Sequence, residues 1–85
     1  MLIKAIDYKC SLIFQDPGYG DQITKKIYPK KYLELYNIKN LFRVELPAFW
    51  RMLYTIKQKE TQKTILILDI LDHNDYNKLF GYKKR

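Results

Sequence analysis

The sequence contains few of the residues that build disulfide bonds, metal centres and phosphate-binding loops. Its 85 residues include one cysteine, one histidine, three glycines and three prolines. A single cysteine excludes an internal disulfide, and one histidine with one cysteine falls short of the converging ligands of a zinc site. The glycines do not form the GxGxxG or GKS/GKT patterns that cradle phosphates. We therefore expect neither a metal ion nor any other cofactor.

Long apolar runs are also missing. No stretch approaches the ~20 apolar residues of a membrane span, and the segment after Met1 lacks the long apolar region of a signal peptide. The chain length suits one small domain with a modest core, which we place over residues 1–85. Cys10 lies among apolar residues, where we expect a packed and unreactive thiol. These features predict a soluble, cytoplasmic protein that does not contact membranes.

Positive charge dominates the composition. Sixteen Lys and Arg residues exceed nine Asp and Glu residues, which gives a formal net charge of +7. This excess favours contact with phosphate groups or with an acidic protein. Lys25 and Lys26 form one basic patch, in a region with the composition of a loop, and Lys83, Lys84 and Arg85 form another at the end of the sequence.

The stretch LFRVELPAFWRMLY, from Leu41 to Tyr54, organises the rest of the chain. Apolar and charged residues alternate on both sides of a short turn at Pro47, which predicts a β-hairpin. Because successive side chains of a strand point to opposite faces, one face is expected to be apolar and buried. Its members are Phe42, Val44, Leu46, Trp50, Met52, Tyr54 and Ile56. The opposite face then carries Arg43, Glu45 and Arg51.

The remaining segments predict an α+β domain. An N-terminal helix and a short second helix are expected to pack on an antiparallel sheet of three strands. Apolar spacing by threes and fours marks the first helix, and a near-continuous apolar run marks the last strand. The predicted order is a helix over 2–15, a loop over 17–29, a short helix over 30–36 ended by Asn37, the hairpin, a polar turn over 57–63, a strand over 64–72 and a polar, aromatic tail over 73–85.

One constellation suits phosphodiester chemistry, since the hairpin and the end of the last strand can bring its members to one edge of the sheet. The residues are Arg43, Glu45, Arg51, His73 and Tyr76. Cleavage of RNA through its 2′-OH needs a base, cations at the scissile phosphate and an acid for the leaving oxygen. A guanidinium binds two phosphate oxygens at once, His73 or Glu45 can act as the base, and Tyr76 or His73 as the acid. Phe80 and Tyr82 can stack on bases.

Simpler interpretations fit the same residues. An Arg and a Glu on neighbouring strands commonly form a cross-strand ion pair. A lone His73 between Asp72 and Asp75 is commonly a capping or surface residue, and the basic C-terminal residues can be a solvated end. Residue spacing alone leaves the function undecided.

Three segments together resemble the RelE/ParE superfamily of toxins from type II toxin–antitoxin pairs, particularly its archaeal-looking members. They are DPGYGDQITKKIYPKKY, LFRVELPAFWRMLY and DILDHNDYNKLFGYKKR, and the resemblance extends from Asp16 over about four fifths of the chain. The RelE branch consists of endoribonucleases that cut messenger RNA on the ribosome, inhibit translation and are neutralised by a cognate antitoxin. The ParE branch shares the fold and instead poisons DNA gyrase.

The resemblance assigns roles by position. Arg43 matches the first basic strand residue of the RelE enzymes, and Arg51 matches the arginine of the second hairpin strand. His73 and Tyr76 match the basic residue and the tyrosine that follow the last strand. Glu45 departs from the pattern, because the best-known enzymes have a second lysine there. A carboxylate at this position can act as the base or can neutralise Arg43.

The resemblance also implies partners. It predicts a metal-independent RNase whose partners are the antitoxin, the ribosome and messenger RNA, with Lys25, Lys26, Tyr82 and the terminal basic residues on the RNA-binding surface. The family begins with a strand and a helix that this sequence lacks, so the domain resembles an N-terminally truncated member. An open sheet edge can then pair with the antitoxin or with a second copy in a homodimer. The alternatives are a gyrase-binding toxin and an inactive, truncated interaction protein.

Overall fold

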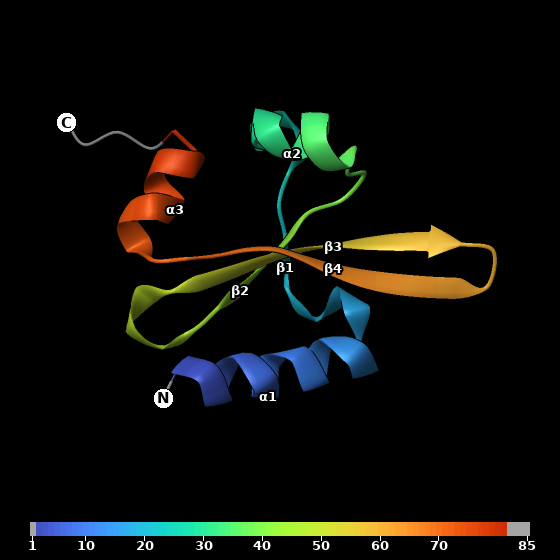
Figure 1. Ribbon diagram of the computed structural model, residues 1–85, viewed down its shortest axis with the longest axis horizontal. Helices are drawn as coiled ribbons and strands as arrows, with labels where there is room; N and C mark the ends of the chain where they lie inside the picture. Colours follow the sequence, from blue (N-terminus) through green and yellow to red (C-terminus); the bar gives the residue numbers. More distant parts are fainter. Residues whose placement is uncertain (1, 82–85) are drawn as a thin grey trace.

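A computed structural model of the chain describes residues 2–81. Within this range the fold has three α-helices and four β-strands, joined in part by short 3₁₀ turns (Figure 1). The helices are α1 (Leu2–Gln15), α2 (Lys30–Tyr36) and α3 (His73–Leu79), and the strands are β1 (Asp21–Gln22), β2 (Phe42–Glu45), β3 (Arg51–Lys59) and β4 (Gln62–Leu71). The α+β class that the sequence predicts is confirmed.

The sheet is antiparallel, and its strands lie in chain order, β1-β2-β3-β4. The prediction of three strands is wrong, because the segment after α1 contributes the short fourth strand β1. Asp21 pairs with Arg43 and Gln22 pairs with Phe42. This strand forms in a segment for which the sequence predicts only an extended loop, since its pairing depends on a distant partner and not on local apolar alternation.

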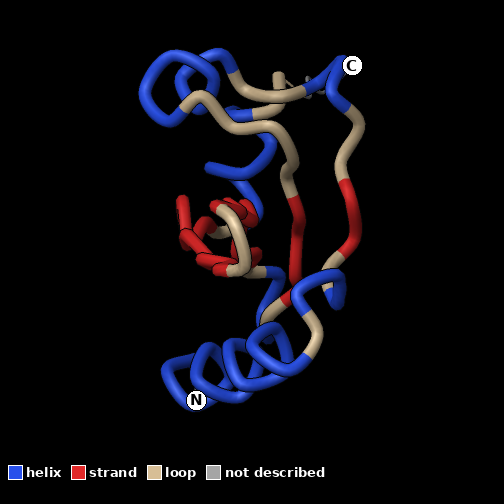
Figure 2. The backbone as a smooth tube through the Cα atoms, turned by 90° about the vertical axis from the view of Figure 1, so that its right-hand side faces the viewer, coloured by secondary structure: helices blue, strands red, loops and turns tan. Residues whose placement is uncertain are grey.

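Helices cover both faces of the sheet. Figures 1 and 2 show α1 on one side of the strands and α2 with α3 on the other. The first core lies between α1 and the sheet, and its buried residues are Ile13, Phe42, Val44, Leu46, Met52 and Tyr54. Trp50 and Ile56 are half-buried against it, so the predicted apolar face of the hairpin is confirmed. The second core is formed by Ile23, Tyr32, Ile38, Leu41, Leu53 and Tyr76.

The ends of α2 follow from its sequence. The helix begins directly after Pro29, the N-cap residue, whose ψ of 135° is not helical. It ends at Asn37, which adopts the left-handed conformation (φ 49°) and donates its N–H to the carbonyl of Leu33. Asparagine tolerates this conformation better than most residues. The predicted bounds of this short helix and its ending residue are both confirmed.

Two further segments differ from the sequence-based expectation. The expected polar turn over 57–63 belongs mostly to the β3–β4 hairpin, whose tip is reduced to Glu60 and Thr61. The expected tail contains the helix α3. Asp72 caps this helix by accepting a hydrogen bond from the N–H of Asp75 at 2.8 Å, and Tyr76 anchors it in the second core.

Cys10 is free and half-buried against the first core. Across residues 2–81, no helix combines the length and the apolar character that crossing a membrane requires.

Candidate functional site

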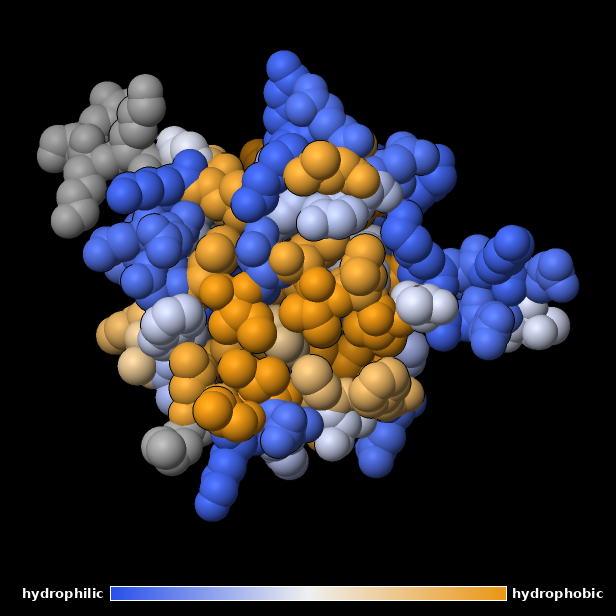
Figure 3. Space-filling view, in the orientation of Figure 1, coloured by the Kyte–Doolittle hydropathy of each residue, from blue (hydrophilic) through white to orange (hydrophobic). Residues whose placement is uncertain are grey.

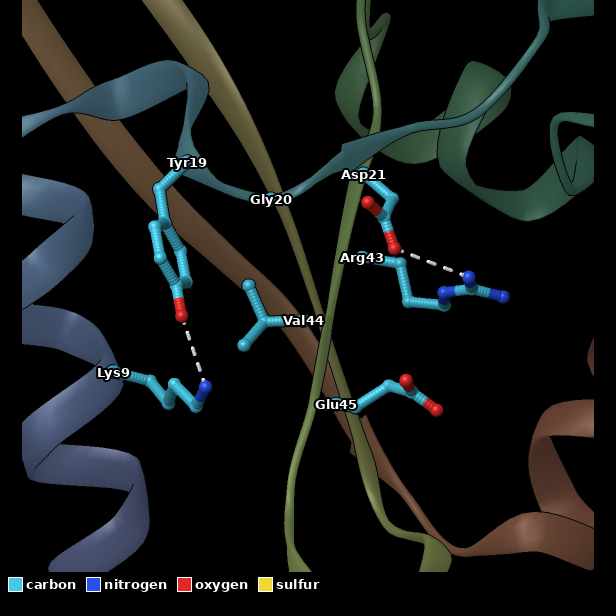
Figure 4. Close-up of a pocket in the computed structure, with 7 residues that line it drawn as sticks. All are labelled: Lys9, Tyr19, Gly20, Asp21, Arg43, Val44 and Glu45. Carbon is cyan, nitrogen blue, oxygen red and sulfur yellow. Dashed lines mark hydrogen bonds and ion pairs between the residues drawn. The ribbon is translucent and has the colours of Figure 1, made fainter.

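Arg43 and Arg51 lie on neighbouring strands and project from the same face of the sheet. In the register of β2 and β3, Arg43 faces Leu53 and Glu45 faces Arg51. Leu53 is buried in the second core, beneath α2 and α3. Because directly opposed residues of an antiparallel pair share a face, both guanidinium groups rise on the side where α3 lies. Figure 4 shows Arg43 and Glu45 extending away from α1.

Tyr76 of α3 contacts both arginines. Nη1 of Arg43 donates a hydrogen bond to the Tyr76 hydroxyl over 3.3 Å, and the guanidinium carbon of Arg51 lies 4.9 Å from the centre of the Tyr76 ring. Tyr76 is 4% exposed. We refer to Arg43, Arg51 and Tyr76 as the Arg–Tyr cluster. Its two cations sit at the edge of the second core, held by one buried phenol.

Each arginine also has a carboxylate neighbour. Nη2 of Arg43 lies 3.3 Å from Oδ2 of Asp21, and Nη2 of Arg51 lies 4.0 Å from Oε1 of Glu45. The cross-strand ion pair that the sequence allows is therefore formed, and its carboxylate belongs to a 68% exposed side chain. Ion pairs with such exposed carboxylates are weak. The carboxylate that pairs with Arg43 is that of Asp21 and not that of Glu45.

Arg43 remains a cation in this setting. The hydrogen bond with Tyr76 is the largest influence that raises the pKa of Arg43 above its ordinary value, and Asp21 raises it further, against an opposing effect of burial. Arg51 is fixed in a different way, because its Nη1 donates to the backbone carbonyl of Phe49 at 2.7 Å. Both side chains are thus held in place before any ligand arrives.

Each of the two arginines has one buried donor without a hydrogen-bond partner among the described residues. This donor is Nε in both Arg43 and Arg51. A buried donor without an acceptor costs about 1–3 kcal/mol, so such atoms in a folded protein call for an explanation. Because both Nε atoms are buried, an external anion does not reach them in this arrangement.

His73 is the first residue of α3 and lies one turn before Tyr76. Its exposed ring stands 6.1 Å from the ring of Phe49, and its Nε2 lies 3.3 Å from Nδ2 of Asn77. Phe49 is 72% exposed and also supplies the carbonyl that holds Arg51. His73 therefore borders the Arg–Tyr cluster through Phe49. Within residues 2–81 no hydrogen bond links it directly to either arginine.

The outer side of β2 borders a hollow of about 180 Å³ (Figure 4). Its two walls differ in character. On the α1 side Nζ of Lys9 donates to the hydroxyl of Tyr19 at 3.0 Å, while on the opposite side Asp21 pairs with Arg43. Its full lining is Lys9, Tyr19, Gly20, Asp21, Arg43, Val44 and Glu45.

Of the other basic residues predicted to bind RNA, only Lys25 and Lys26 lie within residues 2–81, and neither belongs to the Arg–Tyr cluster. Lys25 and Lys26 are exposed in the 3₁₀ turn η2 (Lys25–Ile27). The half-buried ring of Phe80 packs on that of Tyr76 with 4.7 Å between centroids. Its stacking on bases stays a prediction. The predictions for Tyr82, Lys83, Lys84 and Arg85 lie outside the described residues.

Sequence reasoning missed two residues of this site. Asp21 pairs with Arg43 because β1 joins the sheet beside β2, and nothing in its local sequence signals that pairing. Phe49 lies in the 3₁₀ turn η3 (Pro47–Phe49), with a positive φ of 64°. The turn between the predicted strands could have marked Phe49 as an exposed tip. Among the described residues, no three His, Cys or carboxylate side chains gather into a group able to hold a metal ion.

Comparisons with known proteins give no match: no protein-family model fits the sequence, and no curated protein or solved structure is significantly similar to the chain.

Proposed function

We propose that this protein is a RelE-like toxin, a ribosome-dependent endoribonuclease that cleaves messenger RNA without a metal ion and is neutralised by a cognate antitoxin. The observation that carries the proposal is the Arg–Tyr cluster, in which Arg43 and Arg51 share one face of the hairpin and contact Tyr76. His73 lies one helical turn away. This arrangement supplies two fixed cations from the central strands β2 and β3 and an imidazole from α3.

The arginines are assigned to the scissile phosphate. In cleavage through the 2′-OH, the 2′ oxygen attacks phosphorus, a second negative charge develops on the phosphoryl oxygens, and the 5′ oxygen leaves. A guanidinium fork matches two phosphoryl oxygens at once. Cations that are already in place stabilise this charge without reorganising during the reaction.

The different burial of Tyr76, His73 and Glu45 separates the positioning role from the acid and base roles. Tyr76 is 4% exposed and its hydroxyl faces Arg43, so we assign it to positioning the arginines. His73 is exposed, and an imidazolium can donate a proton, which suits the acid that protonates the leaving 5′ oxygen. Glu45 is also exposed and adjoins Arg51, which suits the base that removes the 2′-OH proton.

The proposed partners follow from charge and from the sheet. A formal net charge of +7 favours the ribosome, messenger RNA and an acidic antitoxin. β4 is the last strand of the sheet and spans ten residues. An open strand of this kind accepts an added strand. Either the antitoxin or a second copy of this chain is a suitable occupant.

Mapping of cleavage sites in ribosome-bound messenger RNA tests the proposal. The wild-type protein is expected to cut at the ribosomal A site in the presence of a metal chelator, and Arg51→Ala is expected to abolish the cuts. Because Arg51 also binds the carbonyl of Phe49, circular dichroism must show that the variant is folded. Lys30→Ala, which removes an exposed cation on α2, serves as the control and should retain cleavage.

Two results would contradict the proposal. A folded wild-type protein that leaves ribosome-bound messenger RNA intact would exclude this RNase activity for the chain. Supercoiling assays with DNA gyrase would then separate a ParE-like poison from an inactive interaction protein. Cleavage that persists unchanged in folded Arg51→Ala would instead show that the Arg–Tyr cluster is not part of the active site.

A further inference from the structure

A second basic surface lies on the projecting half of the β3–β4 hairpin, away from the Arg–Tyr cluster. A hollow of about 700 Å³ is bordered there by Lys39, Lys57 and Lys59. The rest of its lining is Asn37, Asn40, Ile56, Gln58, Gln62 and Thr64, with no aspartate or glutamate. We call this hollow the lysine groove. Its positive charges have no carboxylate within the lining to neutralise them.

The lysine groove exists because β3 and β4 are longer than β2. Phe42, the first residue of β2, pairs with Tyr54, so β3 continues from Thr55 to Lys59 with β4 alone beside it. Figure 1 shows this part of the hairpin projecting from the body of the fold. The side chain of Asn40 takes the place of a strand partner, since it accepts from the N–H of Ile56 at 2.7 Å and donates to its carbonyl at 2.9 Å.

The groove continues toward the Arg–Tyr cluster. A second hollow, of about 250 Å³, shares Lys39 with the lysine groove and is also bordered by Lys25 and Tyr28. It reaches Gln22, which adjoins Asp21, the ion-pair partner of Arg43. No carboxylate lines this hollow either. Basic side chains thus follow one another from the hairpin to Lys25 in η2, and the ion pair of Asp21 with Arg43 lies beyond Gln22.

We infer that the lysine groove and the adjoining hollow hold the phosphate backbone of a single strand of RNA and lead it to the Arg–Tyr cluster. Lysines spaced along a groove follow a phosphate backbone without reading its bases. The half-buried ring of Tyr28 offers a surface on which a base can stack. This inference rests on the proposed function for its substrate class, whereas its test measures binding and not cleavage.

The test is fluorescence anisotropy with a labelled, 2′-O-methylated oligouridylate, which lacks the free 2′-OH and cannot be cut. The groove variant combines Lys39→Gln with Lys59→Gln and keeps Lys57, because Nζ of Lys57 donates to the carbonyl of Tyr36 at 2.9 Å. The matched control combines Lys4→Gln with Lys30→Gln, which removes the same charge from exposed positions on α1 and α2. Circular dichroism confirms that both variants are folded.

The groove variant is expected to bind the oligouridylate about ten-fold more weakly than the wild type, and the control less than about three-fold. The slope of log K against log salt should become shallower by about 1.4 in the groove variant, or about 0.7 for each lost phosphate contact. Equal losses in the two variants would overturn the inference, because they would show a response to net charge alone. Unchanged binding in the groove variant would overturn it as well.

Two competitors test whether the ligand of the lysine groove is RNA, DNA or an acidic protein segment. Polyglutamate is added at the same concentration of negative charges as the oligouridylate. If it displaces the oligouridylate, the assignment to nucleic acid is overturned and an acidic protein segment is favoured. DNA presents the same phosphate backbone, so an oligodeoxythymidylate of equal length is the second competitor. RNA that binds as tightly as this DNA or more tightly supports the inference, and DNA that binds about ten-fold more tightly would overturn it. These outcomes hold whether or not the protein cleaves RNA.

Discussion

The hydroxyl of Tyr76 accepts a hydrogen bond from Nη1 of Arg43 over 3.3 Å, which ties α3 to the strand β2. The same tyrosine ring lies 4.9 Å from the guanidinium carbon of Arg51 on β3. One residue near the end of the chain therefore fixes two side chains from the central hairpin. The position of α3 therefore contributes to the geometry of both cations, together with Asp21 and the carbonyl of Phe49.

Tyr76→Phe is expected to lower the free energy of unfolding by about 1–2 kcal/mol, because Arg43 loses a partly buried acceptor while the ring stays in place. Urea denaturation at neutral pH measures the change. Tyr36→Phe is the matched control, since no hydrogen bond is recorded for its hydroxyl within residues 2–81. A Tyr76→Phe variant as stable as the wild type would show that the hydrogen bond contributes nothing to folding.

The environment of the Tyr32 hydroxyl predicts that the folded protein loses stability in alkali. Its fully buried hydroxyl donates to Oδ2 of Asp69 at 2.6 Å, and burial followed by this contact raises its pKa well above the ordinary 10.0. The unfolded chain therefore releases this proton near pH 10 while the folded chain keeps it. The unfolded state then binds fewer protons, so stability is retained below pH 10 and declines above it, by up to about 1.4 kcal/mol per pH unit.

Urea denaturation between pH 8 and pH 11 checks this prediction. Tyr32→Phe should be less stable than the wild type near neutral pH, because it lacks the hydrogen bond to Asp69, and its decline above pH 10 should be shallower. Burial also raises the pKa of Tyr28 and of Tyr54, so some decline remains in the variant. Parallel curves for the two proteins would contradict the assignment to Tyr32.

Asn40→Ala is expected to cost about 2 kcal/mol of unfolding free energy. The Thr55 hydroxyl has one proton and lies 2.7 Å from the backbone carbonyl of Asn40, an acceptor that the variant keeps. The Asn40 side chain itself exchanges two hydrogen bonds with the backbone of Ile56. Each contributes about 1 kcal/mol. Faster hydrogen exchange at the N–H of Ile56 should accompany the loss. The exposed Asn74→Ala is the control, and an equal effect there would contradict this role.

Gly20 and Gly18 form a matched pair for testing close packing against β2. A Cβ on Gly20 would lie 2.9 Å from the carbonyl oxygen of Arg43 and 2.9 Å from the hydroxyl of Tyr54, whereas one on Gly18 would come no closer than 3.7 Å to another group. Gly20→Ala is expected to destabilise the fold by about 1–3 kcal/mol, and Gly18→Ala by far less. Thermal denaturation separates the two, and equal midpoints would contradict the clash.

Much of the fold could be predicted from local patterns. The spacing of apolar residues over 2–15 locates α1, the alternation over 41–54 locates the hairpin, and Asn37 marks the end of α2. These signals succeed because periodicity reflects the face that each element buries. The helix α3 also carries such a signal, with an Asp72 cap and apolar residues at Tyr76, Leu79 and Phe80. The abundance of polar residues around them obscured it.

The candidate site could be predicted less completely. The alternation of the hairpin places Arg43, Glu45 and Arg51 on one face from sequence alone, as the register shows. The contact between Arg43 and Asp21 could not be predicted, since it depends on β1 pairing across the chain. The burial of Tyr76 likewise depends on α3 folding back over the sheet. The local sequence determines which face of a strand or helix a residue occupies, and tertiary packing determines which of these faces contact one another.

The strand order of the sheet has a consequence for how the protein folds. Each strand pairs with its neighbour in the sequence, and the longest pairing joins β3 to β4 across a tip of only Glu60 and Thr61. Short loops close quickly and at little entropic cost. We therefore expect the β3–β4 hairpin to form early, with β2 and then β1 adding to it. The Arg–Tyr cluster would be completed late, when α3 docks onto strands that are already paired.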